Sequence, residues 1–433
     1  MGDKIMMQND FFEFMDCSVT AFQAVAETAR RLEREGYERI YEKDSWTIRP
    51  GDKKYIVRND SSLIAFCVPQ IQNSGRKAEK QDLKGFHMVC AHSDSPCFKL
   101  KEKAGIAVED GYLKLNVENY GGMIKETWLD RPLSLAGRVV VRKEGLSLET
   151  KLIDMKEPLF IIPSLAVHMK RGGEKEGELN TQLHLLPLAG TTADKEMLDQ
   201  KIAGELSVNA EDVLGADLYL YPVQKSLAMG LSGELIGAPR LDDLSCVYCG
   251  MKALIESKPT DKIALLAVFD NEEVGSQTMQ GAASDFLLSV LQRICESMEL
   301  SLPCLLAESF LVSADNAHAL HPNYQEKSDP TNRPLLNKGI VIKYHGAQKY
   351  TTSAYSGAYV KAICEKEKVP YQTYHNRSDI AGGSTLGNIA LTSVSVPAAD
   401  IGLPQLAMHA AFETAGKEDV SHMTRFMTAF YCS

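Results

Sequence analysis

The segment KIALLAVFDNEEVGS (residues 262–276) decides the fold that this sequence predicts. Its first part, KIALLAVFD (262–270), is a continuous apolar run of strand length. Such a run predicts a strand that is buried on both faces, as inner strands of an α/β sheet are. Its second part is polar, so the end of this strand can carry functional side chains.

Strands and helices alternate along the chain around this segment. Apolar runs predict further strands at 55–60, 62–68, 86–91, 309–315 and 339–345. Helical periodicity predicts helices at 18–36, 243–257, 281–299, 353–368 and near 417–431. This alternation favours a parallel α/β sheet with helices on both faces.

A different pattern occupies the middle of the chain. Alternating stretches such as YLKLNVE (112–118) and GRVVVRKEG (137–145) predict a mostly β module with a short helix near 195–206. The best metal-ligand candidates lie on both sides of this module, and a metal site must bring them together. We therefore expect one catalytic domain, residues 1–100 plus 233–433, that carries residues 101–232 as an inserted β-rich domain.

Composition excludes several classes of function. The 433 residues include 47 Lys and Arg against 57 Asp and Glu, which gives a net charge of −10. This balance argues against nucleic-acid binding, which depends on neutralising phosphates. No apolar stretch is long enough for a membrane span, and no signal peptide is expected. The ten cysteines are scattered, which favours reduced thiols and a cytoplasmic location.

Five short polar clusters hold the candidate functional residues. They are AHSDSP (91–96), PRLDDLS (239–245), FDNEEVGS (269–276), SADNAH (313–318) and LAMHAAFE (406–413). Most of them follow an apolar strand, and ligands of open α/β sheets bind at the carboxyl ends of strands. The candidates are His92, Asp94, Asp242, Asp243, Glu272, Glu273, Asp315, His318 and His409.

Imidazole and carboxylate ligands suit Zn²⁺, Co²⁺ or Mn²⁺. Two such ions held close together need a bridging carboxylate, and they acidify a shared water into a hydroxide nucleophile. In the pair Glu272-Glu273 one carboxylate can coordinate while its neighbour takes the proton of this water. Asp94 can hold the tautomer of His92. Each cluster alone is more typical of a surface turn, a helix cap or a buried histidine than of a metal site, but together they favour a dinuclear metallohydrolase.

The strings that carry these residues resemble a known family. AHSDSPCFKLK, GAPRLDDLSCVYC, FDNEEVGS, SADNAHALHPNY, VIKYHGAQKY and AMHAAFETAG are similar to motifs of the aspartyl aminopeptidase family, whose members are dizinc exopeptidases. The resemblance covers essentially the whole chain. It implies a phosphorylase/hydrolase-like α/β catalytic domain, with a mixed sheet flanked by helices, and an inserted β dimerisation domain. It also implies a homo-oligomer, a tetrahedral dodecamer built from dimers, that cleaves peptides.

The resemblance assigns roles residue by residue. His92 and Asp315 are implied to bind one zinc, Glu273 and His409 the other, and Asp242 to bridge them. It further implies that Glu272 is the general base and that Asp94 orients His92.

Four more residues match positions that contact substrate in the family. The pocket positions are matched by His318, Lys343 and Tyr350, and His168 matches a histidine that the inserted domain lends to a neighbouring subunit. A buried Lys343 would favour an N-terminal Asp or Glu in the substrate. Alternatively, Lys343 holds a structural carboxylate such as Asp315 or Asp379.

Two departures and two alternatives stay open. Asp243 stands where the family usually has Asn, and His345 stands where a smaller or less polar residue is common. Instead of an Asp/Glu preference, the same dizinc chemistry can serve neutral or basic N-terminal residues, or small acylated amines. A catalytically silent peptide-binding shell is the alternative outside enzymes.

Overall fold

The computed structural model describes the chain except residues 1, 71–82, 110, 171–177 and 192–193. The described chain divides into two compact units. The first contains residues 1–94, 226–408 and 413–433, and the second contains residues 95–225 and 409–412. No helix of the described residues has both the length and the apolar composition to cross a bilayer.

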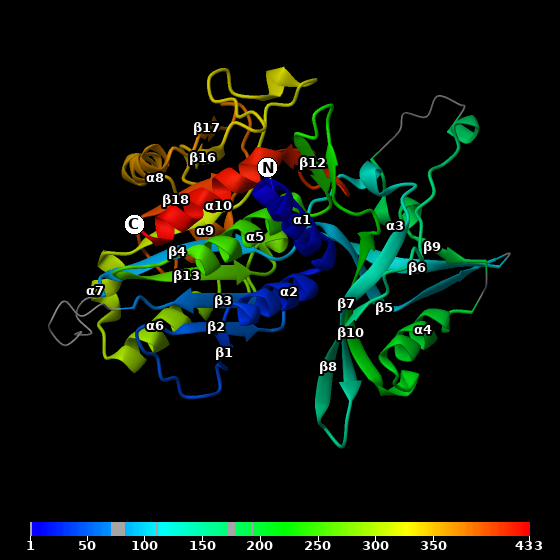
Figure 1. The fold of residues 1–433 in the computed structure, drawn as a ribbon. Helices are drawn as coiled ribbons and strands as arrows, with labels where there is room; N and C mark the ends of the chain where they lie inside the picture. The colour runs from blue at the N-terminus through cyan, green and yellow to red at the C-terminus, as the bar shows by residue number, and fades with distance from the viewer. Residues whose placement is uncertain (1, 71–82, 110, 171–177, 192–193) are drawn as a thin grey trace. The chain divides into compact units, whose positions relative to one another are not determined.

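The first unit is built on a nine-stranded sheet (Figure 1). Its strands, in spatial order, are β1 (Glu38–Arg39), β2 (Lys53–Arg58), β3 (Ser62–Cys67), β13 (Lys262–Phe269), β4 (Gly85–His92), β14 (Phe310–Ala314), β18 (Ala398–Gly402), β16 (Ile340–Tyr344) and β17 (Tyr371–His375). A smaller sheet of the same unit contains β11 (Leu227–Met229), β12 (Leu235–Ala238), β20 (Glu413–Gly416), β19 (Pro404–Leu406) and β15 (Ala317–His318).

Helices cover both faces of the large sheet. One face carries α1 (Gly2–Cys17), α2 (Ala21–Arg34), α5 (Leu241–Glu256), α8 (Ala354–Glu367) and α10 (Lys417–Tyr431). The other face carries α6 (Phe286–Met298), α7 (Leu302–Ala307) and α9 (Leu386–Ala390). The central strand β13 shows why both faces need cover. Leu266 and Val268 belong to one apolar core, while Leu265 and Ala267 belong to the other. The prediction of a doubly buried strand is confirmed.

The expectation of a parallel sheet was wrong for part of this sheet. β13 pairs in parallel with β4, and β14 pairs in parallel with both β4 and β18. However, β3 is antiparallel to β2 and to β13, and β16 is antiparallel to β18. Asn59 and Asp60, both with left-handed φ, close a tight turn between β2 and β3. A turn this short permits only antiparallel pairing. The sheet is therefore mixed, as the family resemblance implied.

The second unit contains an antiparallel six-stranded sheet. Its strands, in spatial order, are β8 (Leu148–Asp154), β7 (Leu133–Arg142), β10 (Val213–Pro222), β5 (Cys97–Val108), β6 (Tyr112–Tyr120) and β9 (Leu188–Gly190). Its helices are α3 (Thr181–His184) and α4 (Met197–Leu206). Leu135, Val139 and Leu220 contribute to a separate apolar core together with Trp128.

Candidate metal centre

Polar side chains gather where neighbouring parallel strands of the first unit end. His92 is the last residue of β4, Asp315 follows β14, and Glu272 follows β13 after a two-residue turn. Because β13 and β14 both pair with β4 in parallel, their carboxyl ends meet at one edge of the sheet. The N-terminus of α5 brings Asp242 to the same place. This confirms that clusters distant in the sequence share one edge.

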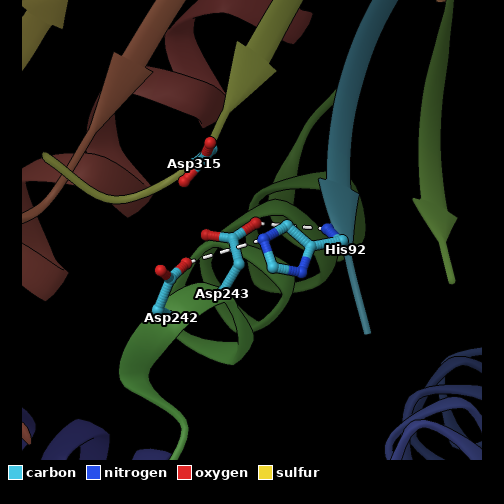
Figure 2. A group of neighbouring side chains, drawn as sticks. All are labelled: His92, Asp242, Asp243 and Asp315. Carbon is cyan, nitrogen blue, oxygen red and sulfur yellow. Dashed lines mark hydrogen bonds and ion pairs between the residues drawn. The ribbon is translucent and has the colours of Figure 1, made fainter. Parts of the chain in front are cut away.

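His92 is the centre of this arrangement (Figure 2). Its imidazole is buried, with Nε2 3.5 Å from Oδ1 of Asp242. On the other side, Nδ1 lies 3.1 Å from the main-chain oxygen of Asp94 and 3.4 Å from Oδ1 of the same residue. The His92 main-chain N–H donates to Oδ2 of Asp243 at 3.1 Å. The ring is therefore fixed by Asp94, and Nε2 faces the carboxylates.

Two groups of these side chains offer ligand atoms within 4.8 Å of one another. The first contains His92, Asp242, Asp243 and Asp315, and the second contains His92, Glu272 and Glu273. The structure thus brings together all the predicted ligands that belong to the first unit.

The carboxylate of Asp94 also organises the turn after β13. Its Oδ1 accepts the main-chain N–H of Glu272 at 3.2 Å, and its Oδ2 accepts that of Glu273 at 3.1 Å. One aspartate therefore aligns both the His92 imidazole and the backbone of the paired glutamates. The sequence predicted the first of these contacts but not the second.

Burial and charge crowding shift the titration of these groups. Burial opposes the charged form of His92, but hydrogen bonds to Asp242 and Asp94 outweigh it and raise the pKa of His92 well above its ordinary value. Burial, followed by nearby carboxylates such as Asp315, raises the pKa of Glu272 to about 8. Burial likewise raises the pKa of Asp243 well above its usual range. For Glu272 and Asp243 burial is the larger cause of the raised pKa, and the neighbouring carboxylates add to it.

Lys343 contacts this group through Asp315. Its ammonium donates to the main-chain oxygens of Asp315 at 2.7 Å and of Asn316 at 3.2 Å. It also lies 3.5 Å from Oδ2 of Asp315. Asp379 instead pairs with Arg377 at 2.8 Å. Of the two roles that the sequence left open for Lys343, these contacts favour holding Asp315.

Aromatic side chains border Lys343. The ring centroid of Tyr350 lies 5.1 Å from the Lys343 ammonium and 5.7 Å from the ring of His345. His318 is exposed, with its ring 6.1 Å from that of Tyr374. Because the rings of Tyr374 and Tyr350 lie 6.4 Å apart, the predicted pocket residues His318, Lys343 and Tyr350 belong to one cluster. Tyr374 was not predicted, because nothing in its sequence context marks it.

Two predicted residues belong to the second unit. His409 has left-handed φ of 68°, and its Nδ1 lies 2.7 Å from the main-chain oxygen of Gly122. His168 is exposed on the 3-10 turn Val167–Lys170. The roles of both histidines stay predictions.

Sequence analysis missed a supporting residue four positions after His409 in the sequence. Glu413 is buried, and its Oε2 accepts the main-chain N–H of Asp242 at 3.0 Å. It lies in the cluster LAMHAAFE (406–413), where only the histidine was considered. The signal that was available is a glutamate at the start of a short strand, Glu413–Gly416, that is followed by small residues.

The donor set fits divalent cations. Six carboxylates, those of Asp94, Asp242, Asp243, Glu272, Glu273 and Asp315, gather around one imidazole. The ammonium of Lys343 compensates only part of their charge. Buried like charges at this density are costly without a counter-charge, and imidazole with carboxylate oxygens is the ligand set of zinc and related ions. An α/β sheet with such a cluster at its strand ends is typical of metal-dependent hydrolases.

Comparisons with known proteins agree with this class. The sequence profile of the family described as aminopeptidase I zinc metalloprotease (M18) matches residues 14–431. A relative from Clostridium novyi, named probable M18 family aminopeptidase 2, is 41% identical over 439 residues and covers all of both chains. The chain therefore belongs to the M18 family, and it is a metallo-aminopeptidase.

Solved structures share the fold over nearly the whole chain. Ape4, solved in a complex with Nbr1, is 34% identical with a TM-score of 0.91, over 98% of this chain and 84% of that one. The S. cerevisiae mApe1 dodecamer is 26% identical with a TM-score of 0.85, over all of this chain and 97% of that one. The mixed α/β architecture is thus that of M18 aminopeptidases.

Proposed function

We propose that this chain removes the N-terminal residue of peptides, preferably Asp or Glu, with two zinc ions per subunit. The observation that carries this proposal is the cluster of buried carboxylates around His92 at the strand ends. Co²⁺ and Mn²⁺ suit the same ligands and are expected to substitute.

The proposed ligands divide between the two ions. His92 and Asp315 would hold one ion, Glu273 and His409 would hold the other, and Asp242 would be a ligand of both. When bound, the ions polarise the scissile carbonyl group and acidify the attacking water. Their charge also compensates the carboxylates that Lys343 leaves unneutralised.

Glu272 is the proposed general base. It accepts a proton from the water as the water oxygen attacks the scissile carbonyl carbon, and it then gives this proton to the leaving amine nitrogen as the C–N bond breaks. Asp94 supports this role, because it fixes the main-chain N–H of Glu272. Tyr350, His318 and His168 are the proposed donors to the developing oxyanion. Lys343 borders this pocket and acts there through Asp315.

The preference for an acidic N-terminal residue is supported by two basic side chains, His345 and Lys349, that both contact the main-chain oxygen of Ala381. His345 also packs edge-to-face against Tyr350. Lys349 donates to the main-chain oxygens of Ala381 at 3.0 Å and Gly382 at 2.8 Å, which leaves its positive charge without compensation by these partners. A preference for neutral or basic residues is the alternative that a substrate panel decides.

We propose a homo-oligomer, a dodecamer built from dimers, in which His168 reaches a neighbouring active site. The exposed side chains of Leu165, Val167 and Met169 flank His168, and apolar groups gathered in this way are typical of an interface. The related mApe1 was solved as a dodecamer. A cytoplasmic location is supported by the ten cysteines, all of them within the described residues and none in a disulfide.

The variant Glu272→Gln tests this function. We expect it to fold and to retain metal, but to lose about 10²–10⁴-fold in kcat, because the positioned base is removed. Activity is measured on Asp-, Glu-, Ala-, Leu- and Lys-anilides, and metal is quantified on the same samples. Glu256→Gln, an exposed change on α5, is the matched control. Full activity of Glu272→Gln would exclude Glu272 as the base.

A further inference from the structure

The turn that carries Glu272 depends on the residue before it. Asn271 is buried and has left-handed backbone angles, φ 63° and ψ 25°. Few residues other than Gly and Asn adopt this region without strain. Because Glu272 follows directly, the backbone of Asn271 sets the direction in which the Glu272 side chain leaves the main chain.

The side chain of Asn271 closes the loop that follows. Its Oδ1 accepts two hydrogen bonds, from Oγ1 of Thr278 and from Nε2 of Gln280, both at 2.8 Å. Its main-chain oxygen accepts the N–H of Ser276 at 2.8 Å. One amide oxygen therefore ties the start of the loop to residues seven and nine positions later.

The far end of this loop is itself anchored to the sheet. Ser62, the first residue of β3, donates through its hydroxyl to the main-chain oxygen of Gln280 at 2.7 Å. Arg58, the last residue of β2, donates to the main-chain oxygen of Met279 at 3.1 Å. Through Thr278 and Gln280, Asn271 thus connects the Glu272 backbone to two neighbouring strands.

We propose that Asn271 is a positioning residue for the reaction, holding Glu272 at the angle that its proton transfers require. This inference rests on the proposed role of Glu272. Asp94 fixes the turn from one side through the N–H groups of Glu272 and Glu273. Asn271 fixes it from the other side through the loop. The hydrogen bonds that Oδ1 of Asn271 accepts come from Thr278 and Gln280, which are not proposed metal ligands.

The test separates the backbone of Asn271 from its side chain. Asn271→Gly keeps the left-handed conformation and removes the amide. Thr278→Val and Gln280→Met each remove one donor and leave Asn271 in place. We expect kcat to fall about 10–100-fold in Asn271→Gly and less in the two donor variants, with KM and metal content unchanged. The combination of Asn271→Gly with Gln280→Met is expected to lose no more than Asn271→Gly alone.

Two comparisons make the result decisive. Thr428→Val removes a hydroxyl that donates to the main-chain oxygen of Thr424 within α10, and it is expected to keep wild-type kcat. Glu272→Gln is assayed beside the others. If Asn271→Gly has wild-type kcat while Glu272→Gln is inactive, the positioning role of Asn271 is overturned and the role of Glu272 as base stands. The positioning role is also overturned if the losses of Asn271→Gly and Gln280→Met add up in the double variant. An active Glu272→Gln would instead overturn the proposed base. If Asn271→Gly does not fold, the two donor variants decide: unchanged kcat in both would overturn the role.

Discussion

Replacing Lys343 with methionine tests how a buried cation supports the site. The ammonium has three N–H donors; it donates to the main-chain oxygens of Asp315 and Asn316, and it lies 3.5 Å from the carboxylate of Asp315. Burial disfavours the ammonium, but Asp315 outweighs this and raises the pKa of Lys343 above its ordinary value. Lys343→Met keeps most of the volume and removes the charge.

The structure sets the size of the effect. Lys343 is 2% exposed, so water does not screen the pair. Removing one partner of a buried ion pair costs about 3–5 kcal/mol, because the other charge stays buried without compensation. For a chain of 433 residues that corresponds to a fall in Tm of roughly 3–6 °C. Bound metal partly replaces the missing charge beside Asp315, so the fall is larger in metal-free protein.

Calorimetry with and without metal measures the stability, and anilide hydrolysis measures the substrate dependence. We expect kcat/KM to fall by a similar factor for Asp- and Leu-anilides, because the ammonium acts through Asp315. Lys252→Met removes a half-buried lysine of α5 that pairs with the exposed Glu256, and it should change neither property. An unchanged Tm together with a loss confined to Asp and Glu substrates would show that Lys343 serves the substrate directly.

Two further predictions concern pH and assembly. Burial, and secondly Lys262 at 3.1 Å, lowers the pKa of His87 to about 3. The folded protein therefore favours neutral His87, and this contribution to the free energy of unfolding is fully present above pH 6.5 and is lost as the pH falls towards 3. His87→Leu should flatten this part of the Tm profile, which spans at most about 4–5 kcal/mol, and an unaltered profile would refute the assignment. Co-expression of His168→Ala with Glu272→Gln should restore about one quarter of wild-type activity. Random pairing makes about half of the dimers mixed, and one of the two sites in each mixed dimer has both an intact Glu272 and a partner's intact His168. Activity equal to the average of the separate variants would refute the exchange of His168.

Much of the fold followed from local patterns. The apolar run at 262–270 has the length and uniformity of a strand between two helical layers, and β13 occupies it from Lys262 to Phe269. The sequence did not reveal whether neighbouring strands run parallel or antiparallel, because an apolar run looks the same in both kinds of pairing. The helix expected from residue 281 begins at Phe286. Gly281 instead packs in the preceding turn, where a Cβ atom would lie 2.2 Å from the Ser276 oxygen.

The part of the site that could be predicted consists of ligand-type side chains in short sequence motifs. His92, Asp242 and Asp315 stand at the ends of predicted elements, and ligand-type side chains there are informative by themselves. The partners of Asn271 and Glu413 were not predictable in this way. Their roles depend on hydrogen bonds to residues that only the folded chain brings close, such as the main-chain N–H of Asp242.

The most direct test of the whole account is chelation and metal rescue with metal quantified on the same sample. We expect about two zinc ions per subunit, loss of anilide hydrolysis on chelation, and its return with Zn²⁺, Co²⁺ or Mn²⁺, strongest on Asp- or Glu-anilide. Rescued activity that is strongest on Leu- or Lys-anilide would keep the metal chemistry and contradict the acidic preference. Purified protein that holds no metal, or hydrolysis that chelators leave unchanged, would contradict the metal centre itself.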